Sequence, residues 1–154
     1  YTTLFRSIPL YYNKKAPQSH DYVEMSASPL YPFGYGLSYT SFDYSDLHLS
    51  ALTPRSFEVS FKVRNTGKYD GEEVAQLYLR DEYASVVQPL KQLKHFARFY
   101  LKRGEEREVK FILSEEDFSL VDRNLKSIVE PGTFQIMIGA ASDDIRLQTK
   151  VEIK

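Results

Sequence analysis

The sequence predicts an all-β fold, in which a two-sheet antiparallel sandwich follows an extended N-terminal lead-in. Three observations support this prediction. Apolar and polar residues alternate in several segments after residue 38, which is the pattern of half-buried strands. Turn-forming residues separate these segments at intervals of about 8–12 residues, as in β-sandwiches. Aromatic residues make up 14% of the 154 residues, and they are all Tyr or Phe, which pack well on pleated sheets.

Residues 1–38 are expected to form an extended lead-in, and residues 39–154 the sandwich domain. The lead-in shows no sustained periodicity, and its polar run at 13–21 is typical of a loop. It contains the prolines Pro9, Pro17, Pro29 and Pro32. It begins at Tyr1 and lacks the layout of a signal peptide. We therefore expect the chain to have been cut from something longer.

The first two predicted strands differ in regularity. Phe42 and Tyr44, then Leu47 and Leu49, alternate with one slip in parity, which predicts a β-bulge. Residues 57–63 alternate between apolar and polar side chains without interruption. This second segment is the clearest half-buried strand in the sequence.

The middle of the chain predicts a central strand. Turn residues at 65–67 and 70–71 lead to a nearly continuous apolar run at 74–79. A run of this kind indicates a strand whose two faces are both covered. Residues 81–90 are expected to form a loop, and residues 93–101 a further strand with an irregular face.

The last part of the chain completes the sandwich. Residues 109–113 alternate again, and the sequence at 114–117 resembles a capping box, which predicts one helical turn. After a turn at 130–132, the final strands are expected at 134–138 and 145–153. About seven strands, without the Cys…Trp…Cys pattern of immunoglobulin domains, favour a sandwich of the fibronectin type III kind.

Composition excludes several classes of function. The chain contains no Cys, so disulfides, thiol catalysis and thiolate metal sites are excluded. A net charge of −1 argues against a nucleic-acid partner, which usually requires a basic surface. No apolar run reaches the roughly 18–20 residues of a membrane span, so no membrane span is expected.

The residues alone show no catalytic constellation. His20, His48 and His95 are far apart in the sequence and are expected at the surface. The acidic cluster at 115–117 is explained by favourable charge at a helix start, and Asp143-Asp144 by a turn. No nucleophile elbow or phosphate-binding loop is present. We therefore expect no catalytic residue, no metal site and no cofactor in this chain.

Four parts of the sequence, however, match a known pattern. The first is the aromatic run PLYPFGYGLSYTSF at 29–42. It is followed by VRNTG and DGEEVAQLYL within 63–79, by PLKQLKHF at 89–96, and by EPGTF and IGAAS within 130–142. In this order and spacing, they resemble the C-terminal fibronectin type III-like domain of family 3 glycoside hydrolases, the β-glucosidase and β-xylosidase group. His95 departs from the pattern, which usually has Gly at that position.

The resemblance implies that the parent protein is a retaining, exo-acting hydrolase. Such an enzyme cleaves terminal β-glycosidic bonds in carbohydrate metabolism and needs no cofactor. Its nucleophile lies in an N-terminal barrel and its acid/base residue often in an α/β sandwich domain, and neither region is in this sequence. The chain alone is therefore expected to be inactive. Its implied role is that of an accessory domain that braces these two catalytic domains, and its implied location is periplasmic or extracellular.

Two candidate sites follow from the resemblance. Residues 29–38 are expected to be a joint that follows the end of the preceding α/β sandwich domain. When the catalytic domains are absent, this joint is expected to leave ring surface uncovered. Tyr39–Phe42 are expected to open the first strand. The docking side chains of this joint are expected to be Tyr31, Phe33, Tyr35 and Leu37. The loop after the central strand is expected to face the rim of the substrate pocket, with the candidate residues Asp81, Glu82, Tyr83, Ser85 and Gln88.

Two other functions stay open at this point. Exposed rings such as those of Tyr31, Tyr35 and Tyr83 could stack on pyranose faces, which would make the chain a carbohydrate-binding module with an oligosaccharide partner. Alternatively, the chain is a free-standing adhesion or scaffold domain. Saccharide titration tests the first alternative, and the upstream coding sequence tests the second.

Overall fold

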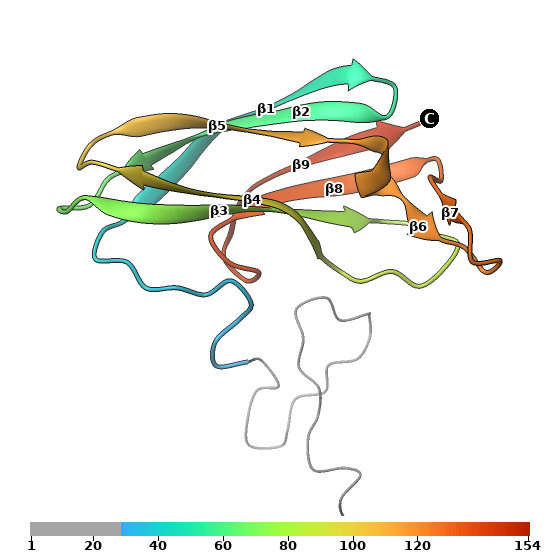
Figure 1. Ribbon diagram of the computed structural model, residues 1–154, viewed down its shortest axis with the longest axis horizontal. Coiled ribbons are helices and arrows are strands. Elements are labelled where there is room, and N and C mark those ends of the chain that lie inside the picture. The colour runs from blue at the N-terminus through green and yellow to red at the C-terminus, as the bar shows by residue number, and fades with distance from the viewer. Residues whose placement is uncertain (1–28) are drawn as a thin grey trace, which may run out of the picture.

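The computed structural model describes residues 29–154, which form a sandwich of two antiparallel sheets (Figure 1). The predicted all-β sandwich is therefore confirmed, while residues 1–28 of the predicted lead-in lie outside the described residues. The first sheet has the order β1-β2-β5, with β1 (Phe42–Thr53), β2 (Ser56–Asn65) and β5 (Glu106–Leu113). The second has the order β4-β3-β8-β9, with β3 (Gly71–Asp81), β4 (Gln92–Leu101), β8 (Gly132–Gly139) and β9 (Ile145–Ile153).

β1 contains the bulge that its parity slip predicts. Its pairing with β2 passes from Ser45 opposite Lys62 to His48 opposite Ser60, so β1 has one extra residue here. Asp46, within the bulge, has a φ of 53°, and its carboxylate lies 2.9 Å from Nζ of Lys62. The extra residue turns the side chains on both sides of the bulge toward the same core.

The core lies between the two sheets and follows the alternation in the sequence. Four alternate residues of β2 point inward and are buried: Phe57, Val59, Phe61 and Val63. They face inward residues of the second sheet such as Leu77 and Ile136 in one continuous apolar cluster. Burial of this apolar surface is the main stabilising contribution to the sandwich.

β3 is a central strand, as its apolar run predicts, because it pairs with both β4 and β8. Ala75, Leu77 and Leu79 are buried on the inner face of the second sheet. Gln76 and Tyr78 alternate with them and therefore point to the outer face. They are nevertheless buried as well, so another part of the chain covers the outer face at this point.

The predicted helical turn is present, as the 3-10 helix η1 (Glu115–Phe118). The backbone N–H of Ser114 donates to Oδ2 of Asp117 over 2.8 Å, as a capping box requires. His95 on β4 also approaches this carboxylate, with its Nε2 3.2 Å from Oδ2. Its ring stacks on Phe111 of β5, so His95 is partly covered although its side chain stays 33% exposed, and His20 lies outside the described residues.

Two further details differ from the sequence predictions. β1 begins at Phe42 and not at Tyr39, because Ser41 accepts hydrogen bonds from the turn after β2 and does not continue the ladder. A two-stranded hairpin of β6 (Leu120–Val121) and β7 (Ser127–Ile128), which is too short to produce an alternation, was not predicted. Within residues 29–154, no helix is long and apolar enough to cross a membrane.

Candidate functional site

The residues that carry the aromatic run form a distinct segment before β1. Residues 29–41, called the strap from here on, run along the outside of the second sheet and then enter the first sheet at β1 (Figure 1). The strap contains no regular strand or helix. Its course is set by two anchors, one near its middle at residues 33–34 and one at its end at residue 40.

The first anchor joins the strap to Gln76 on the outer face of β3. Nε2 of Gln76 donates to the carbonyl oxygen of Gly34 over 3.4 Å and to that of Ala140, in the β8–β9 turn, over 2.5 Å. Oε1 of Gln76 accepts a hydrogen bond of 2.5 Å from the hydroxyl of Tyr78. One carboxamide therefore connects the strap, the central strand and the turn.

Gly34 is required at this anchor for two reasons. Its φ is +80°, a conformation that side chains disfavour, and a Cβ atom built on it would lie 2.3 Å from Oε1 of Gln76. The preceding residue adds a backbone bond, since the N–H of Ser142 donates to the carbonyl oxygen of Phe33 over 2.9 Å. Nζ of Lys91, directly after the 81–90 loop, donates to the carbonyl oxygen of Ser142.

The second anchor joins the end of the strap to Asn65, a fully buried residue at the end of β2. Oδ1 of Asn65 accepts a hydrogen bond of 2.6 Å from the hydroxyl of Thr40. Its Nδ2 donates to the carbonyl oxygens of Tyr69 and Leu101 over 2.8 and 3.1 Å. Each polar atom of this buried side chain therefore has a partner, as a stable buried amide requires.

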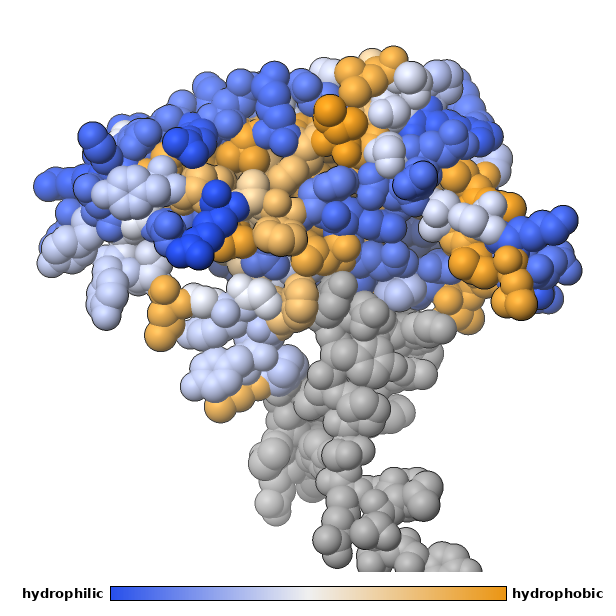
Figure 2. Space-filling model, in the orientation of Figure 1, coloured by the Kyte–Doolittle hydropathy of each residue, from blue (hydrophilic) through white to orange (hydrophobic). Residues whose placement is uncertain are grey.

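Between and beside these anchors, the strap exposes its large apolar side chains. Leu37 is 89% exposed and Tyr39 is 95% exposed. The exposed set also includes Leu30, Tyr31, Phe33 and Tyr35. Below the sandwich, in the region where Figure 1 places the strap, Figure 2 shows small orange groups among pale blue atoms, since this hydropathy scale counts Tyr and Pro as mildly hydrophilic. The predicted docking residues Tyr31, Phe33, Tyr35 and Leu37 therefore lie on one exposed segment.

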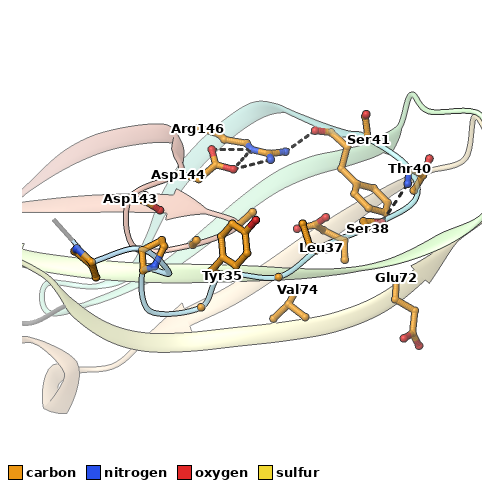
Figure 3. A pocket seen from close by; sticks show the side chains of 18 of the residues that line it. Tyr35, Leu37, Ser38, Thr40, Ser41, Glu72, Val74, Asp143, Asp144 and Arg146 are labelled. Carbon is orange, nitrogen blue, oxygen red and sulfur yellow. Dashed lines mark hydrogen bonds and ion pairs between the residues drawn. The ribbon is translucent and has the colours of Figure 1, made fainter. Parts of the chain in front are cut away.

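A cleft of about 670 Å³ lies between the strap and the second sheet (Figure 3). Tyr35 and Leu37 line it on the side of the strap, and Val74 lines it on the side of β3. Asp144 and Arg146, in the turn before β9 and at its start, complete the wall. The cleft combines an apolar rim with charged groups.

A partly buried polar cluster lies beside this cleft. The hydroxyl of Tyr44 on β1 donates to Oε1 of Glu73 over 3.0 Å, and the guanidinium carbon of Arg146 lies 4.9 Å from the centre of the Tyr44 ring. Arg146 also pairs with Asp144 at 2.8 Å and donates to the carbonyl oxygen of Phe42 over 2.5 Å. The cluster therefore ties β9 and β3 to the point where the strap enters β1.

Burial governs the protonation of this cluster. Removal from water raises the pKa of the Glu73 carboxyl above its usual range, against the hydrogen bond from Tyr44 and the charge of Arg146. Burial and the neighbouring Glu73 carboxylate likewise raise the pKa of the Tyr44 phenol. The hydrogen bond to Asp144 raises the pKa of Arg146. Among residues 29–154, no group of three or more His, Cys, Asp or Glu side chains is placed to hold a metal ion.

The predicted pocket-rim loop begins at the other end of β8. Asp81 pairs with Phe134 near the start of β8, whereas the strap contacts the turn that follows its end. The backbone N–H and the hydroxyl of Ser85 donate to Glu130 over 2.9 and 2.5 Å. The structure therefore does not bring the two predicted sites together as one surface.

Individual residues of this loop are held in different ways. The Tyr83 N–H donates to Oδ1 of Asp81 over 3.0 Å, and the Tyr83 side chain is 83% exposed. Glu82 pairs with Lys150 of β9 at 2.6 Å. Gln88 accepts a hydrogen bond of 3.2 Å from Gln92. Among the large apolar side chains of this loop, Tyr83 is the most exposed, and Val87 is 67% exposed.

Sequence reasoning did not single out the anchoring residues. Gln76 and Tyr78 lie in the stretch DGEEVAQLYL and Asn65 in VRNTG, so the resemblance to a known pattern was the signal that could have marked them. Glu73 lies in the same stretch as Gln76. Arg146 lies outside all the matching stretches, and nothing in the sequence marks it.

Comparisons with known proteins agree with this architecture. The fibronectin type III-like domain family matches residues 73–142. A β-xylosidase of Formosa agariphila is 48% identical over 124 residues, which are 77% of this chain and 17% of that protein. A β-glucosidase of Bacteroides ovatus is 46% identical over 129 residues, 81% of this chain and 17% of that protein. A periplasmic β-glucosidase of Salmonella typhimurium is 41% identical over 140 residues, 88% of this chain and 18% of that protein.

Solved structures give the same result. A β-glucosidase from Listeria innocua in complex with laminaribiose superposes with a TM-score of 0.85 at 33% identity, over 94% of this chain and 22% of that chain. A β-glucosidase from Erythrobacter marinus superposes with a TM-score of 0.87 at 40% identity, over 94% of this chain and 20% of that chain. The chain thus spans about a fifth of the length of its relatives. It belongs with the fibronectin type III-like domains of the family 3 β-glucosidases and β-xylosidases.

Proposed function

We propose that this chain is the accessory C-terminal domain of a β-glucosidase-like glycoside hydrolase, and that the strap docks it against the catalytic part of the longer protein. One observation carries the proposal. The strap is held at two points by hydrogen bonds to the buried side chains of Gln76 and Asn65, yet it exposes large apolar side chains between and before them. Apolar surface that is ordered and uncovered marks an interaction site.

The order of the strap favours docking. A flexible linker would lose conformational entropy when it binds, whereas a segment already held by Gln76 and Asn65 loses less. The exposed rings of Tyr31 and Tyr35 add large apolar area with few rotatable bonds. The strap is therefore suited to bracing neighbouring domains and not only to connecting them.

The partners in this proposal are the catalytic barrel and the α/β sandwich domain of the same longer protein. The names of the relatives support a parent that hydrolyses terminal β-glycosidic bonds, by the retaining chemistry that the resemblance implies. One relative is named as a periplasmic enzyme, which supports a periplasmic or extracellular location. As part of the same proposal, the boundary between the extended lead-in and the sandwich domain lies between residues 38 and 39.

The loop 81–88 is proposed as a second, smaller contribution to the parent enzyme. Its backbone is held by Glu130, while the Tyr83 ring projects into solvent. A rigidly held loop with one exposed ring is suited to the rim of a substrate pocket. In the longer enzyme, Tyr83→Ala should then raise KM for an oligosaccharide more than for a small aryl glycoside. Equal KM values for wild type and variant on both substrates would remove the loop from this role.

A carbohydrate-binding module is the second candidate. It is favoured by the rings of Tyr31 and Tyr35, whose centroids lie 5.3 Å apart and which are both exposed. Titration of the chain with laminaribiose or xylobiose, followed by NMR shifts of the tyrosine rings, distinguishes the two functions. Saturable shifts confined to these two rings would favour sugar binding, whereas a docking surface predicts none.

The docking proposal is tested in the longer protein with Leu37→Ser. This substitution removes exposed apolar area without touching either anchor, so it should leave the isolated chain as stable as wild type. In the longer protein it should lower the melting temperature and increase proteolysis near residue 37. Leu125→Ser is the matched control, because Leu125 is 87% exposed on the β6–β7 hairpin. Equal effects of the two substitutions in the longer protein would refute docking through the strap.

Catalysis is tested with the isolated chain. We expect no turnover of aryl β-glucosides or aryl β-xylosides by these 154 residues. Turnover that is abolished by replacing one carboxylate of this chain would overturn the accessory role.

A further inference from the structure

We propose that Gln76 is the positioning residue of the strap. Through its hydrogen bonds, Gln76 fixes the position of the docking side chains relative to the sandwich. The inference rests on the proposed function for its purpose, because it explains how the docking surface is held. The hydrogen bonds on which the inference rests all lie within this chain. It is therefore tested on this chain, without the longer protein.

The place of Gln76 in β3 is unusual for a glutamine. It lies on the outer face of the second sheet, where a polar side chain is normally hydrated, yet it is only 4% exposed. A buried amide costs free energy unless its donors and acceptor are all used. Here they are used, by Gly34, Ala140 and Tyr78.

The chemistry of this network is specific to a carboxamide. Two backbone carbonyl oxygens, of Gly34 and Ala140, converge on the side-chain nitrogen of Gln76. A group that satisfies both needs two N–H donors, and a group that accepts from the Tyr78 hydroxyl needs an oxygen beside them. Only the amide of Asn or Gln offers this combination among the side chains. An ionised carboxylate would instead place its charge against both carbonyl oxygens.

The consequence of losing Gln76 should be local. The end of the strap is held independently by Asn65 through Thr40, and the turn after β2 binds Ser41. Removal of the first anchor should therefore free the strap up to residue 39, while β1 keeps its place. This local release distinguishes a positioning residue from one that merely fills the core.

The experiment compares Gln76→Glu with wild type in the 154-residue chain by amide hydrogen exchange. Two amides report on the strap: the N–H of Ser142, which donates to Phe33, and the N–H of Tyr35, which donates to Pro32. At low pH the protonated carboxyl group of the variant can donate one hydrogen bond, so both amides should stay protected. When the pH is raised until this carboxyl ionises, both amides should exchange on the order of tenfold faster than in wild type after correction for intrinsic rates.

Gln135→Glu is the matched control, since Gln135 lies on β8 of the same sheet but bonds only to the exposed Gln148. It should leave both amides as in wild type at each pH. If the glutamate variant does not fold, Gln76→Leu, which lacks both donors but keeps a similar volume, should lose protection of the two amides at every pH.

Unchanged protection of the Ser142 and Tyr35 amides in folded Gln76→Leu, or in folded Gln76→Glu at a pH where the introduced carboxyl is ionised, would overturn the inference. Loss of protection across β2 and β5 as well would also overturn it, because the role would then be general stability. The outcome is separable from that of the docking proposal. A freed strap in the Gln76 variant, together with no effect of Leu37→Ser in the longer protein, would uphold the anchor and reject docking.

Discussion

The hydroxyl of Tyr44 donates a hydrogen bond of 3.0 Å to the carboxylate of Glu73 and so joins the first sheet to the second. Arg146 lies over the Tyr44 ring and bonds to the backbone of Phe42, directly after the strap. The stability of this corner of the sandwich therefore depends on the ionisation of two partly buried groups, Tyr44 and Glu73. A separate pH dependence of the free energy of unfolding is predicted for each group.

Tyr44 should make the fold sensitive to alkaline pH. Its folded pKa is raised, so the unfolded chain releases the phenol proton near pH 10 while the folded chain keeps it. This contribution to the free energy of unfolding is complete below about pH 9 and falls as pH rises further. Tyr44→Phe removes it, at a cost near neutral pH of about 1–3 kcal/mol for the lost hydrogen bond. Urea denaturation between pH 8 and 11 should show a shallower decline in the variant, and parallel curves would contradict the assignment.

Glu73 should make the stability of the fold depend on pH in the acidic range. Because burial raises its folded pKa, the folded chain holds this proton to higher pH than the unfolded chain does. The resulting stabilisation is present below the unfolded value of about 4.3 and is lost as pH rises through the folded value. Glu73→Gln keeps an acceptor for Tyr44 and cannot ionise. The difference in unfolding free energy between variant and wild type should therefore shift in favour of the variant from pH 4 to 7, and a constant difference would exclude this role.

The strands were predictable because their signal is local. The alternation at 57–63 predicts which residues of β2 face the core, and the slip in parity after Tyr44 predicts the bulge of β1. Both predictions use only neighbouring residues. The short strands β6 and β7 gave no such signal, since two residues cannot show a period.

The anchors were not predictable, because each connects residues that are distant in the sequence. Gln76 contacts a carbonyl 64 residues away, and Asn65 a hydroxyl 25 residues away. Alternation indicates that Gln76 faces outward, which normally means hydration. That the strap covers it there follows from the tertiary fold and not from any local pattern.

Asn65 should be among the most sensitive positions outside the apolar core. Asn65→Ala leaves the carbonyl oxygens of Tyr69 and Leu101 without this donor inside the protein. An unsatisfied buried polar group costs about 1–3 kcal/mol, so a loss of about 2–4 kcal/mol in unfolding free energy is expected. Asn124→Ala is the control, since its amide bonds only to an exposed carboxylate in a turn. Chemical denaturation compares the two, and a similar small loss at both sites would show that Asn65 does not hold the strap.

The two glycines of the strap provide the sharpest comparison of neighbouring positions. Gly34→Ala forces a side chain onto a residue with a φ of +80° and places its Cβ against Gln76, whereas a Cβ at Gly36 meets no atom within 4 Å. We expect Gly34→Ala to expose the Ser142 amide to exchange on the order of tenfold faster, because the strap must shift from its first anchor. Gly36→Ala should leave this amide protected and change the unfolding free energy by less than about 1 kcal/mol. In the longer protein, only the change at Gly34 should weaken docking as Leu37→Ser does. Identical exchange in the two glycine variants would mean that the close contact between Gly34 and Gln76 does not determine the path of the strap.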